Sequence, residues 1–160
     1  MSKKGFTLIE ILIVVAIIGI LSSTILVGVG SFRARGRDAR RIADLHQVQN
    51  GLELYFTKTG SYPSARSWSE LTTALTSAEI GVTAVPNDPT TGWNYGYCRP
   101  QGANNQYVIA AHLEDKNNPQ LSQYPASTQF PCIPYLDGTE GASEPCSKAG
   151  QTTNKYCLML

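Results

Sequence analysis

The chain has 160 residues, of which 42% are hydrophobic and 16% are charged, a composition that is typical of one folded domain and excludes wholesale disorder. Its formal net charge of +1 gives no bulk electrostatic reason for nucleic-acid binding. The charge is unevenly distributed, because residues 33–58 carry six Lys or Arg against three acids and residues 59–160 carry five against eight. We therefore expect a basic segment over residues 33–58 and a mildly acidic head.

A long apolar run follows a short, basic N-terminal segment. The run extends from Phe6 to Val29 and contains one charged residue, Glu10. A helix of this length would measure roughly 36 Å, enough to cross the hydrocarbon core of a bilayer. A secretory signal peptide has a shorter apolar region followed by a small-residue cleavage site, so the run predicts a membrane-spanning helix instead.

Two features of the run indicate more than a membrane anchor. A carboxylate inside a membrane helix costs roughly 2.5–3.5 kcal/mol, so Glu10 either has a function or lies near enough to the helix start to reach polar headgroups. Cleavage between Gly5 and Phe6 would give Phe6 a free amine. That amine could pair with Glu10 of a neighbouring subunit inside an apolar bundle, where an unpaired charge is costly.

The segment from Lys3 to Glu10 (KKGFTLIE), continued by IVVAIIGIL at residues 13–21, resembles the class III signal of type IV prepilins and type II secretion pseudopilins. The resemblance implies that a prepilin peptidase cleaves after Gly5, that Phe6 is N-methylated, and that Glu10 is needed for assembly. It also implies three regions: a leader (1–5), a transmembrane and filament-core helix (6–32), and an amphipathic helix plus globular head (33–160).

The residues around the end of the apolar run raise two further points. Many pilins have a helix-kinking proline near the position of Val27, and this chain has none. The arginines after the run would, by the positive-inside rule, place the C-terminal side in the cytoplasm. The prepilin resemblance and the cysteines indicate the opposite orientation, with a cytoplasmic N-terminus.

For the basic cluster at residues 33–41 we favour a solvated or lipid-proximal helix face over inter-subunit salt bridges, and both over DNA binding.

The helical pattern continues beyond the apolar run. Apolar residues recur at three- and four-residue spacing and form a stripe that we expect to pack on the head, with Arg40, Arg41 and Asp44 on the other faces. One helix is thus predicted over about residues 6–57, and Gly60 ends it. The stripe consists of Ile42, Leu45, Val48, Leu52, Tyr55 and Phe56.

The head is predicted to be α+β. Ser67-Trp68-Ser69-Glu70 matches a capping box that begins a short helix over about residues 68–78. Strand patterns occur at residues 93–98, 107–113 and 156–159, and residues 114–131 indicate a long loop. The predicted fold is pilin-like: a long N-terminal helix, with its hydrophobic half protruding, packs on a small antiparallel sheet with long disulfide-bonded loops.

Four cysteines, an even number, predict two disulfides in an exported head, and three connectivities are possible. We favour Cys98–Cys132 together with Cys146–Cys157. The second pair would close a C-terminal loop, similar to the disulfide-bounded region of many pilins. The absence of a Cys-x-x-Cys spacing argues against a zinc or redox site.

Nothing in the chain indicates an enzyme or a cofactor. His46 and His112 lie in no nucleophile or metal motif, so structural or surface roles are predicted for both. Asp137, Glu140 and Glu144 lie in a glycine-rich segment, and related pseudopilins can bind calcium in this region. Their spacing does not match an EF-hand, and we favour a solvated acidic loop over a metal site.

Three functions are compatible with these features. The leading hypothesis is a type IV pilin, which waits in the inner membrane and then polymerises into an extracellular filament. The alternative is a major-pseudopilin-like subunit of a periplasmic secretion pseudopilus. Residues 60–63 (GSYP) resemble a turn of many pseudopilins and minor pilins, and residues 87–89 (NDP) with 95–97 (YGY) resemble a major-pseudopilin signature. The third hypothesis is a membrane-anchored binding protein or enzyme that does not polymerise.

The resemblance also implies the partners of the chain. These are other subunits of the same kind, a prepilin peptidase, membrane lipid before assembly, and a membrane assembly platform driven by a separate ATPase, because the chain itself has no phosphate-binding loop. Nucleic acid is not a predicted partner.

Overall fold

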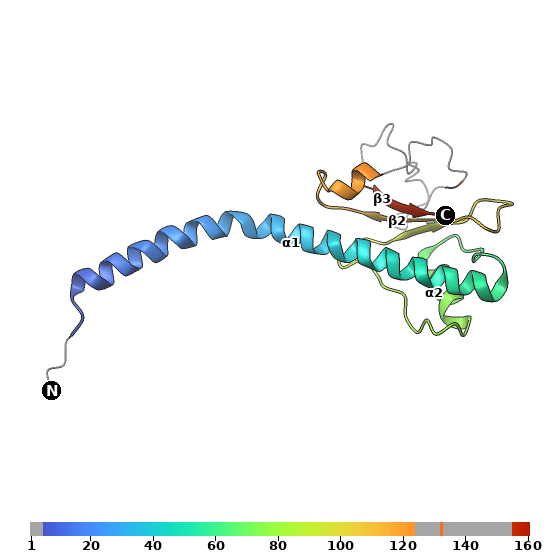
Figure 1. Cartoon of the computed structure of the whole chain (residues 1–160), viewed down its shortest axis with the longest axis horizontal. Coiled ribbons are helices and arrows are strands. Elements are labelled where there is room, and N and C mark those ends of the chain that lie inside the picture. The colour runs from blue at the N-terminus through green and yellow to red at the C-terminus, as the bar shows by residue number, and fades with distance from the viewer. Residues whose placement is uncertain (1–4, 124–131, 133–154) are drawn as a thin grey trace.

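The computed structural model describes residues 5–123, 132 and 155–160, apart from the side chains of residues 24–29. One long helix runs along the head and extends far beyond it toward the N-terminus (Figure 1). In chain order the elements are α1 (Leu8–Thr59), α2 (Trp68–Ser77), β1 (Gly96–Cys98), β2 (Val108–His112), the 3-10 helix η1 (Pro119–Gln123) and β3 (Lys155–Met159).

Helix α1 confirms the predicted long helix to within two residues at each end. Gly60 ends it in the left-handed conformation, with φ of 75°, and donates its backbone N–H to the carbonyl oxygen of Phe56 at 2.8 Å. A glycine suits this position because other residues are disfavoured at positive φ. Gly36 and Gly51 do not interrupt the helix. At Gly51 an added Cβ would lie 3.4 Å from a methyl group of Val82, so the glycine permits close packing.

The head packs around a three-stranded antiparallel sheet with the strand order β1-β2-β3. Successive residues of β2 point to opposite faces, as the pleat requires. Ile109 and Ala111 join the core that includes Leu45 and Leu52 of α1, whereas Val108 and Ala110 pack with the cysteines on the other face. This α+β arrangement confirms the predicted fold class.

Helix α2 covers the core beside α1 and begins as predicted. The Ser67 hydroxyl accepts the backbone N–H of Glu70 at 3.2 Å, while the Glu70 carboxylate accepts the N–H of Arg66 rather than that of Ser67. Its buried side chains are Trp68, Leu71 and Leu75.

The predicted strands are present but shorter or shifted. The first was predicted from residue 93, yet Trp93 donates its backbone N–H to Thr90 in a turn, so β1 is confined to Gly96–Cys98. β3 starts one residue earlier than expected, at Lys155. Part of the predicted loop after residue 113 forms η1, and residues 124–131 lie outside the described part of the chain.

Candidate functional site

The start of α1 carries the first candidate site, which is built by Thr7 and Glu10. Thr7 is the N-cap residue, and its backbone N–H and hydroxyl both donate to Glu10 Oε2, at 2.8 and 2.7 Å. The Glu10 N–H donates in return to the Thr7 hydroxyl at 3.4 Å. This is a capping box, and it places a carboxylate at the positive end of the helix dipole.

The capping box was not anticipated from the sequence, although the Thr-x-x-Glu spacing signals it. It fixes one oxygen of the carboxylate and leaves the other without a hydrogen-bond partner among the residues that the structure describes. Gly5 and Phe6 precede the cap, and Phe6 is 85% exposed. The predicted cleavage point is therefore accessible, while the leader residues 1–4 lie outside the description.

The N-terminal part of α1 is apolar and exposed on all sides. Every large hydrophobic residue from Phe6 to Leu21 is at least 51% exposed, and Phe32 is 68% exposed. A continuous apolar surface of this length is not stable in water alone and marks a surface that another apolar phase or partner covers. We call residues 6–32 the apolar stem.

No helix in the described part of the chain combines the length and apolarity needed to cross a membrane. The transmembrane segment predicted over residues 6–32 includes residues 24–29, whose side chains lie outside the description.

A buried ion-pair cluster holds the head to α1 where the apolar stem ends. Arg41 has no exposed side-chain surface, and its guanidinium contacts three carboxylates. It donates to Asp38 at 2.9 Å, to Asp88 at 2.8 and 3.0 Å, and to Glu114 at 2.7 Å. The Trp93 ring lies over the guanidinium, 4.8 Å from its centroid. We call Arg41 with these carboxylates the Arg41 cluster.

The cluster joins three parts of the chain. Asp38 and Arg41 come from α1, Asp88 from the loop before β1, and Glu114 from the segment that follows β2. Fully buried Asp38 also accepts the backbone N–H groups of Glu114 and Asp115, both at 2.9 Å. The expectation that Arg41 lies on a polar outer face was therefore wrong. Partners 47 and 73 residues away enclose it, and local helical spacing carries no information about them.

The electrostatics of the cluster favour the charged forms. Burial alone lowers the pKa of Arg41, but its hydrogen bonds to Asp88 and Glu114 outweigh burial and raise that pKa overall. Hydrogen bonds from Arg37 first, and then from Arg41, lower the pKa of Glu114 to about 2 against the opposing effect of burial. Paired and hydrogen-bonded in this way, the buried charges are tolerated.

Tyrosines of the head make further contacts with carboxylates of α1. The Tyr62 hydroxyl donates to Glu53 at 3.0 Å, and the Tyr107 hydroxyl donates to the same carboxylate at 3.3 Å. Tyr95 donates to Asp44 at 2.8 Å. Burial, followed by the Glu53 contact, raises the pKa of Tyr62 to about 12. The C-terminal half of α1 is thus held to the head by polar contacts as well as by its apolar stripe.

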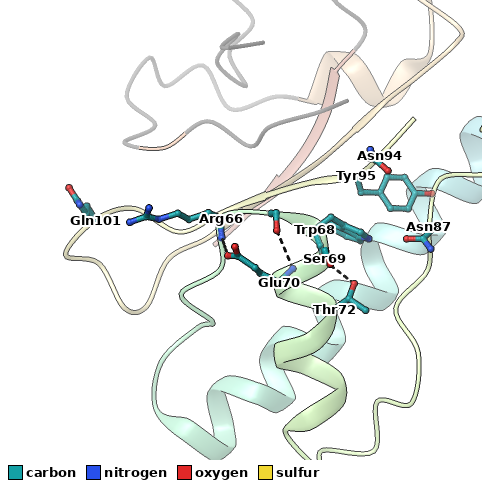
Figure 2. Close-up of a pocket in the computed structure, with 10 residues that line it drawn as sticks. Arg66, Trp68, Ser69, Glu70, Thr72, Asn87, Asn94, Tyr95 and Gln101 are labelled. Atoms are coloured by element: carbon teal, nitrogen blue, oxygen red, sulfur yellow. Dashed lines mark hydrogen bonds between the residues drawn. The ribbon is translucent and has the colours of Figure 1, made fainter. Parts of the chain in front are cut away.

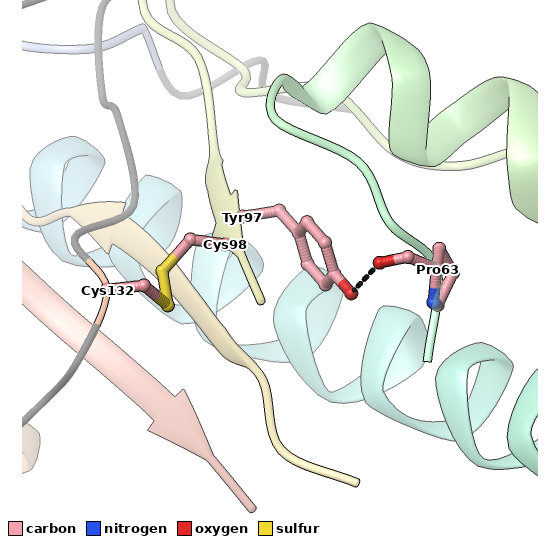
Figure 3. The surroundings of a disulfide bond; sticks show 4 residues. All are labelled: Pro63, Tyr97, Cys98 and Cys132. Atoms are coloured by element: carbon pink, nitrogen blue, oxygen red, sulfur yellow. Dashed lines mark hydrogen bonds between the residues drawn. A yellow bond between two sulfur atoms is a disulfide. The ribbon is translucent and has the colours of Figure 1, made fainter. Parts of the chain in front are cut away.

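The disulfide predicted between Cys98 and Cys132 is present, with the two Cα atoms 6.0 Å apart (Figure 3). The neighbouring Tyr97 side chain points to the opposite side of β1 and donates its hydroxyl to the Pro63 carbonyl oxygen at 2.7 Å. Cys157 in β3 is also disulfide-bonded. Its predicted partner, Cys146, lies outside the described residues.

The remaining predicted residues do not form a site in the described part of the chain. Asp137, Glu140 and Glu144 lie outside it, and no group of three metal-ligating side chains occurs within it. His46 lies on the exposed face of α1, 3.3 Å from the Gln49 side chain. His112 at the end of β2 packs edge-on against Trp93.

A polar groove of about 1050 Å³ lies at the start of α2 (Figure 2). Three of its side chains have partners in the protein: Glu70 accepts the backbone N–H of Arg66 at 2.8 Å, Trp68 donates to the Pro86 carbonyl oxygen at 3.1 Å, and Tyr95 donates to Asp44 at 2.8 Å. The lining residues are Arg66, Ser67, Trp68, Ser69, Glu70, Thr72, Asn87, Asn94, Tyr95 and Gln101.

Comparison with known proteins gives the class of this molecule. Residues 1–26 match the family described as the prokaryotic N-terminal methylation motif. The predicted resemblance to prepilins is thereby confirmed, and the chain carries a prepilin-type N-terminus. No solved structure matches the chain.

The head extends the similarity to particular proteins. The chain is 26% identical over 88 residues to type II secretion system core protein G of Aeromonas hydrophila, which is 55% of this chain and 52% of that protein. The same protein of Escherichia coli (strain K12) is 28% identical over 68 residues (42% of this chain, 47% of that protein). That of Vibrio cholerae serotype O1 is 29% identical over 106 residues (61% and 72%).

The chain spans about half the length of the first two relatives. Over these stretches it is similar to type II secretion system core protein G, and the similarity gives no support to an extracellular pilus. The pseudopilin alternative therefore fits better than the leading hypothesis of a type IV pilin.

Proposed function

We propose that this protein is a pseudopilin, a structural subunit of a type II secretion system that polymerises into a periplasmic pseudopilus and has no enzymatic activity of its own. The observation that carries the proposal is the combination of a prepilin motif at residues 1–26 with similarity to core protein G that extends into the head. The exposed apolar stem supports it, because such a helix needs a partner.

In this proposal the subunit first lies in the inner membrane with its N-terminus in the cytoplasm. A prepilin peptidase cleaves between Gly5 and Phe6, and the new Phe6 amine is methylated. The subunit then leaves the membrane, and the apolar stems of neighbouring subunits replace lipid around one another. Because the head leaves the stem uncovered, the stems can pack together while the heads form the outer surface.

The capping box suggests how Glu10 contributes to assembly. The hydrogen bonds from Thr7 hold the carboxylate at the helix start through Oε2. The other oxygen can then accept a hydrogen bond from the methylated Phe6 amine of a neighbouring subunit. A charge pair of this kind in an apolar bundle sets the register between helices, since any other register leaves a buried charge unpaired.

The decisive experiment is to express the gene at its natural level in its own host and to locate the assembled protein. Restriction to the cell envelope, an N-methylated Phe6 by mass spectrometry, and loss of protein secretion on gene deletion would support the pseudopilin. Long external fibres built from this chain, with secretion intact in the deletion strain, would identify a type IV pilin instead.

A further inference from the structure

Charges at the junction between the apolar stem and the head are sorted by exposure. All of the acids face inward: the Asp38 side chain is fully buried, and those of Asp44, Glu114 and Asp115 are 13%, 21% and 22% exposed. Each accepts a hydrogen bond or lies in an ion pair within the protein. Little negative charge therefore reaches the surface here.

Arg41 is buried among these acids and Arg37 is 40% exposed, but the other cations nearby face outward. The Arg35 and Arg40 side chains are 67% and 62% exposed, although each lies within 4.0 Å of an acid. Arg33 and Lys116 are exposed too, and neither forms an ion pair with another residue that the structure describes. We call Arg33, Arg35, Arg40 and Lys116 the basic collar.

The position of the collar matters as much as its charge. Phe32, the last exposed aromatic residue of the apolar stem, directly precedes Arg33. The three arginines of the collar belong to the part of α1 that leads from the apolar stem to the head, and Lys116 lies between β2 and η1. Figure 1 shows that α1 extends beyond the head toward the N-terminus. An apolar helix followed at once by outward-facing cations has the pattern of a segment that lies at a membrane–water interface, where basic side chains reach the headgroups.

We propose that the basic collar binds anionic phospholipid headgroups and so sets the depth of the subunit in the membrane before assembly. The inference rests on the proposed function in that it places the apolar stem in a bilayer. Guanidinium groups suit this role because they donate two parallel hydrogen bonds to phosphate oxygens. The basic collar directly follows the apolar stem, so a stem inserted in a bilayer holds the collar at the lipid surface. A nucleic acid could reach these cations only if they lay away from the membrane, so we favour lipid as the partner.

The test uses the full chain reconstituted into phosphatidylcholine vesicles. Each preparation holds a trace of dansyl-labelled phosphatidylglycerol or of dansyl-labelled phosphatidylcholine, and energy transfer from the head tryptophans, Trp68 and Trp93, reports which lipid gathers around the protein. We expect stronger transfer to the anionic probe. The Arg33→Gln/Arg35→Gln variant should reduce this preference by at least roughly fivefold, the factor expected for one cation at an anionic surface.

A matched control is Lys58→Gln/Arg66→Gln, which removes two exposed cations from the far end of the head and should keep the wild-type preference. Both variants should melt like the wild type, because exposed ion pairs contribute little to stability. Equal transfer to both probes, or a preference that survives Arg33→Gln/Arg35→Gln, would overturn the proposal. So would arginine-dependent retardation of duplex DNA in the absence of a lipid preference.

A third result separates the collar from the proposed function. If the full chain does not enter vesicles of either composition, the membrane stage of the proposed function is wrong and the collar proposal is wrong with it. Entry without a lipid preference is evidence against the collar alone.

Discussion

The two halves of α1 form one continuous helix but meet different surroundings. Between Leu8 and Leu21 the large apolar side chains are exposed on every side, whereas Leu45 and Leu52 are fully buried against the head. The boundary is the Arg41 cluster. The comparison shows that one helix can have two roles. Its C-terminal half stabilises the head, and its N-terminal half presents the surface for assembly.

This separation predicts that substitutions in the two halves have different consequences. Changes in the apolar stem should alter assembly and leave the stability of the head unchanged. Changes at or after the cluster should alter the free energy of unfolding. This division can be tested by experiment.

The largest effect is expected for Glu10→Ala, which should abolish filament formation while membrane insertion and the melting temperature of the head stay unchanged. The physical reason is that the neighbouring Phe6 amine would be buried without a counter-charge. Assembly is measured by crosslinking in cells, and melting by near-ultraviolet circular dichroism of the full chain in detergent.

Two variants separate the charge of Glu10 from its role as a cap. Glu10→Gln keeps an oxygen that can accept both hydrogen bonds from Thr7 but removes the charge, and it should also fail to assemble. Glu79→Ala removes a carboxylate that is 90% exposed in the head and should assemble normally. Normal filaments from Glu10→Gln would show that the charge is dispensable.

The next effect concerns the Arg41 cluster. Arg41→Met fills a similar volume but leaves Asp38 and Asp88 buried with no cation, which should lower the free energy of unfolding by about 3–5 kcal/mol. Chemical denaturation of the full chain in detergent measures this loss.

The neighbouring Arg40→Met is the matched control, since Arg40 is exposed and should change stability by at most about 0.5 kcal/mol. Adding Asp88→Asn to Arg41→Met should restore part of the stability, because it removes one unpaired charge. Equal stability of Arg41→Met and wild type would mean that the cluster does not hold the head to α1.

A similar or slightly smaller loss is expected for the double variant Cys98→Ser/Cys132→Ser. The disulfide closes a loop with a sequence separation of 34 residues, and removal of such a crosslink costs about 3–4 kcal/mol in the chain-entropy model. Reduction of the wild-type protein should lower its stability at least as far. A double variant as stable as the wild type would refute this contribution.

The smallest effect is a dependence on acid. Glu114 has a pKa of about 2 in the folded protein, against 4.5 for an unperturbed glutamate. Its contribution to the free energy of unfolding is therefore complete above pH 4.5 and is lost as the pH falls toward 2. The loss should be on the order of 1 kcal/mol, because the side chain is partly solvated. Glu114→Gln should flatten the stability profile in that pH window, and an unchanged profile would contradict the assignment.

Local patterns in the sequence predicted much of this molecule. The apolar spacing from Ile42 to Phe56 gave the buried face of α1, and the Ser67 cap gave the start of α2. The bounds of α1 followed because a long periodic segment ending at a glycine leaves few alternatives.

The candidate site was less predictable, for two different reasons. The Thr7–Glu10 capping box has a local signal, the Thr-x-x-Glu spacing, but the same carboxylate inside an apolar run equally fits a membrane charge, so the spacing alone does not predict the cap. The burial of Arg41 was not visible, because it depends on Asp88 and Glu114, which only the tertiary fold brings to α1. An arginine on a helix is usually exposed. No spacing rule identifies an arginine that is buried because its partners are distant in the sequence.

The position of β3 has a consequence for export. Because β3 spans Lys155–Met159 and pairs with β2 along its whole length, the sheet lacks a strand until these residues have joined it. The contacts between β2 and β3 are separated by more than forty residues of chain, and pairings of this kind form late in folding. If the subunit is exported as we propose, the head is thus completed only after Lys155–Met159 have crossed the membrane, later than the insertion of the apolar stem.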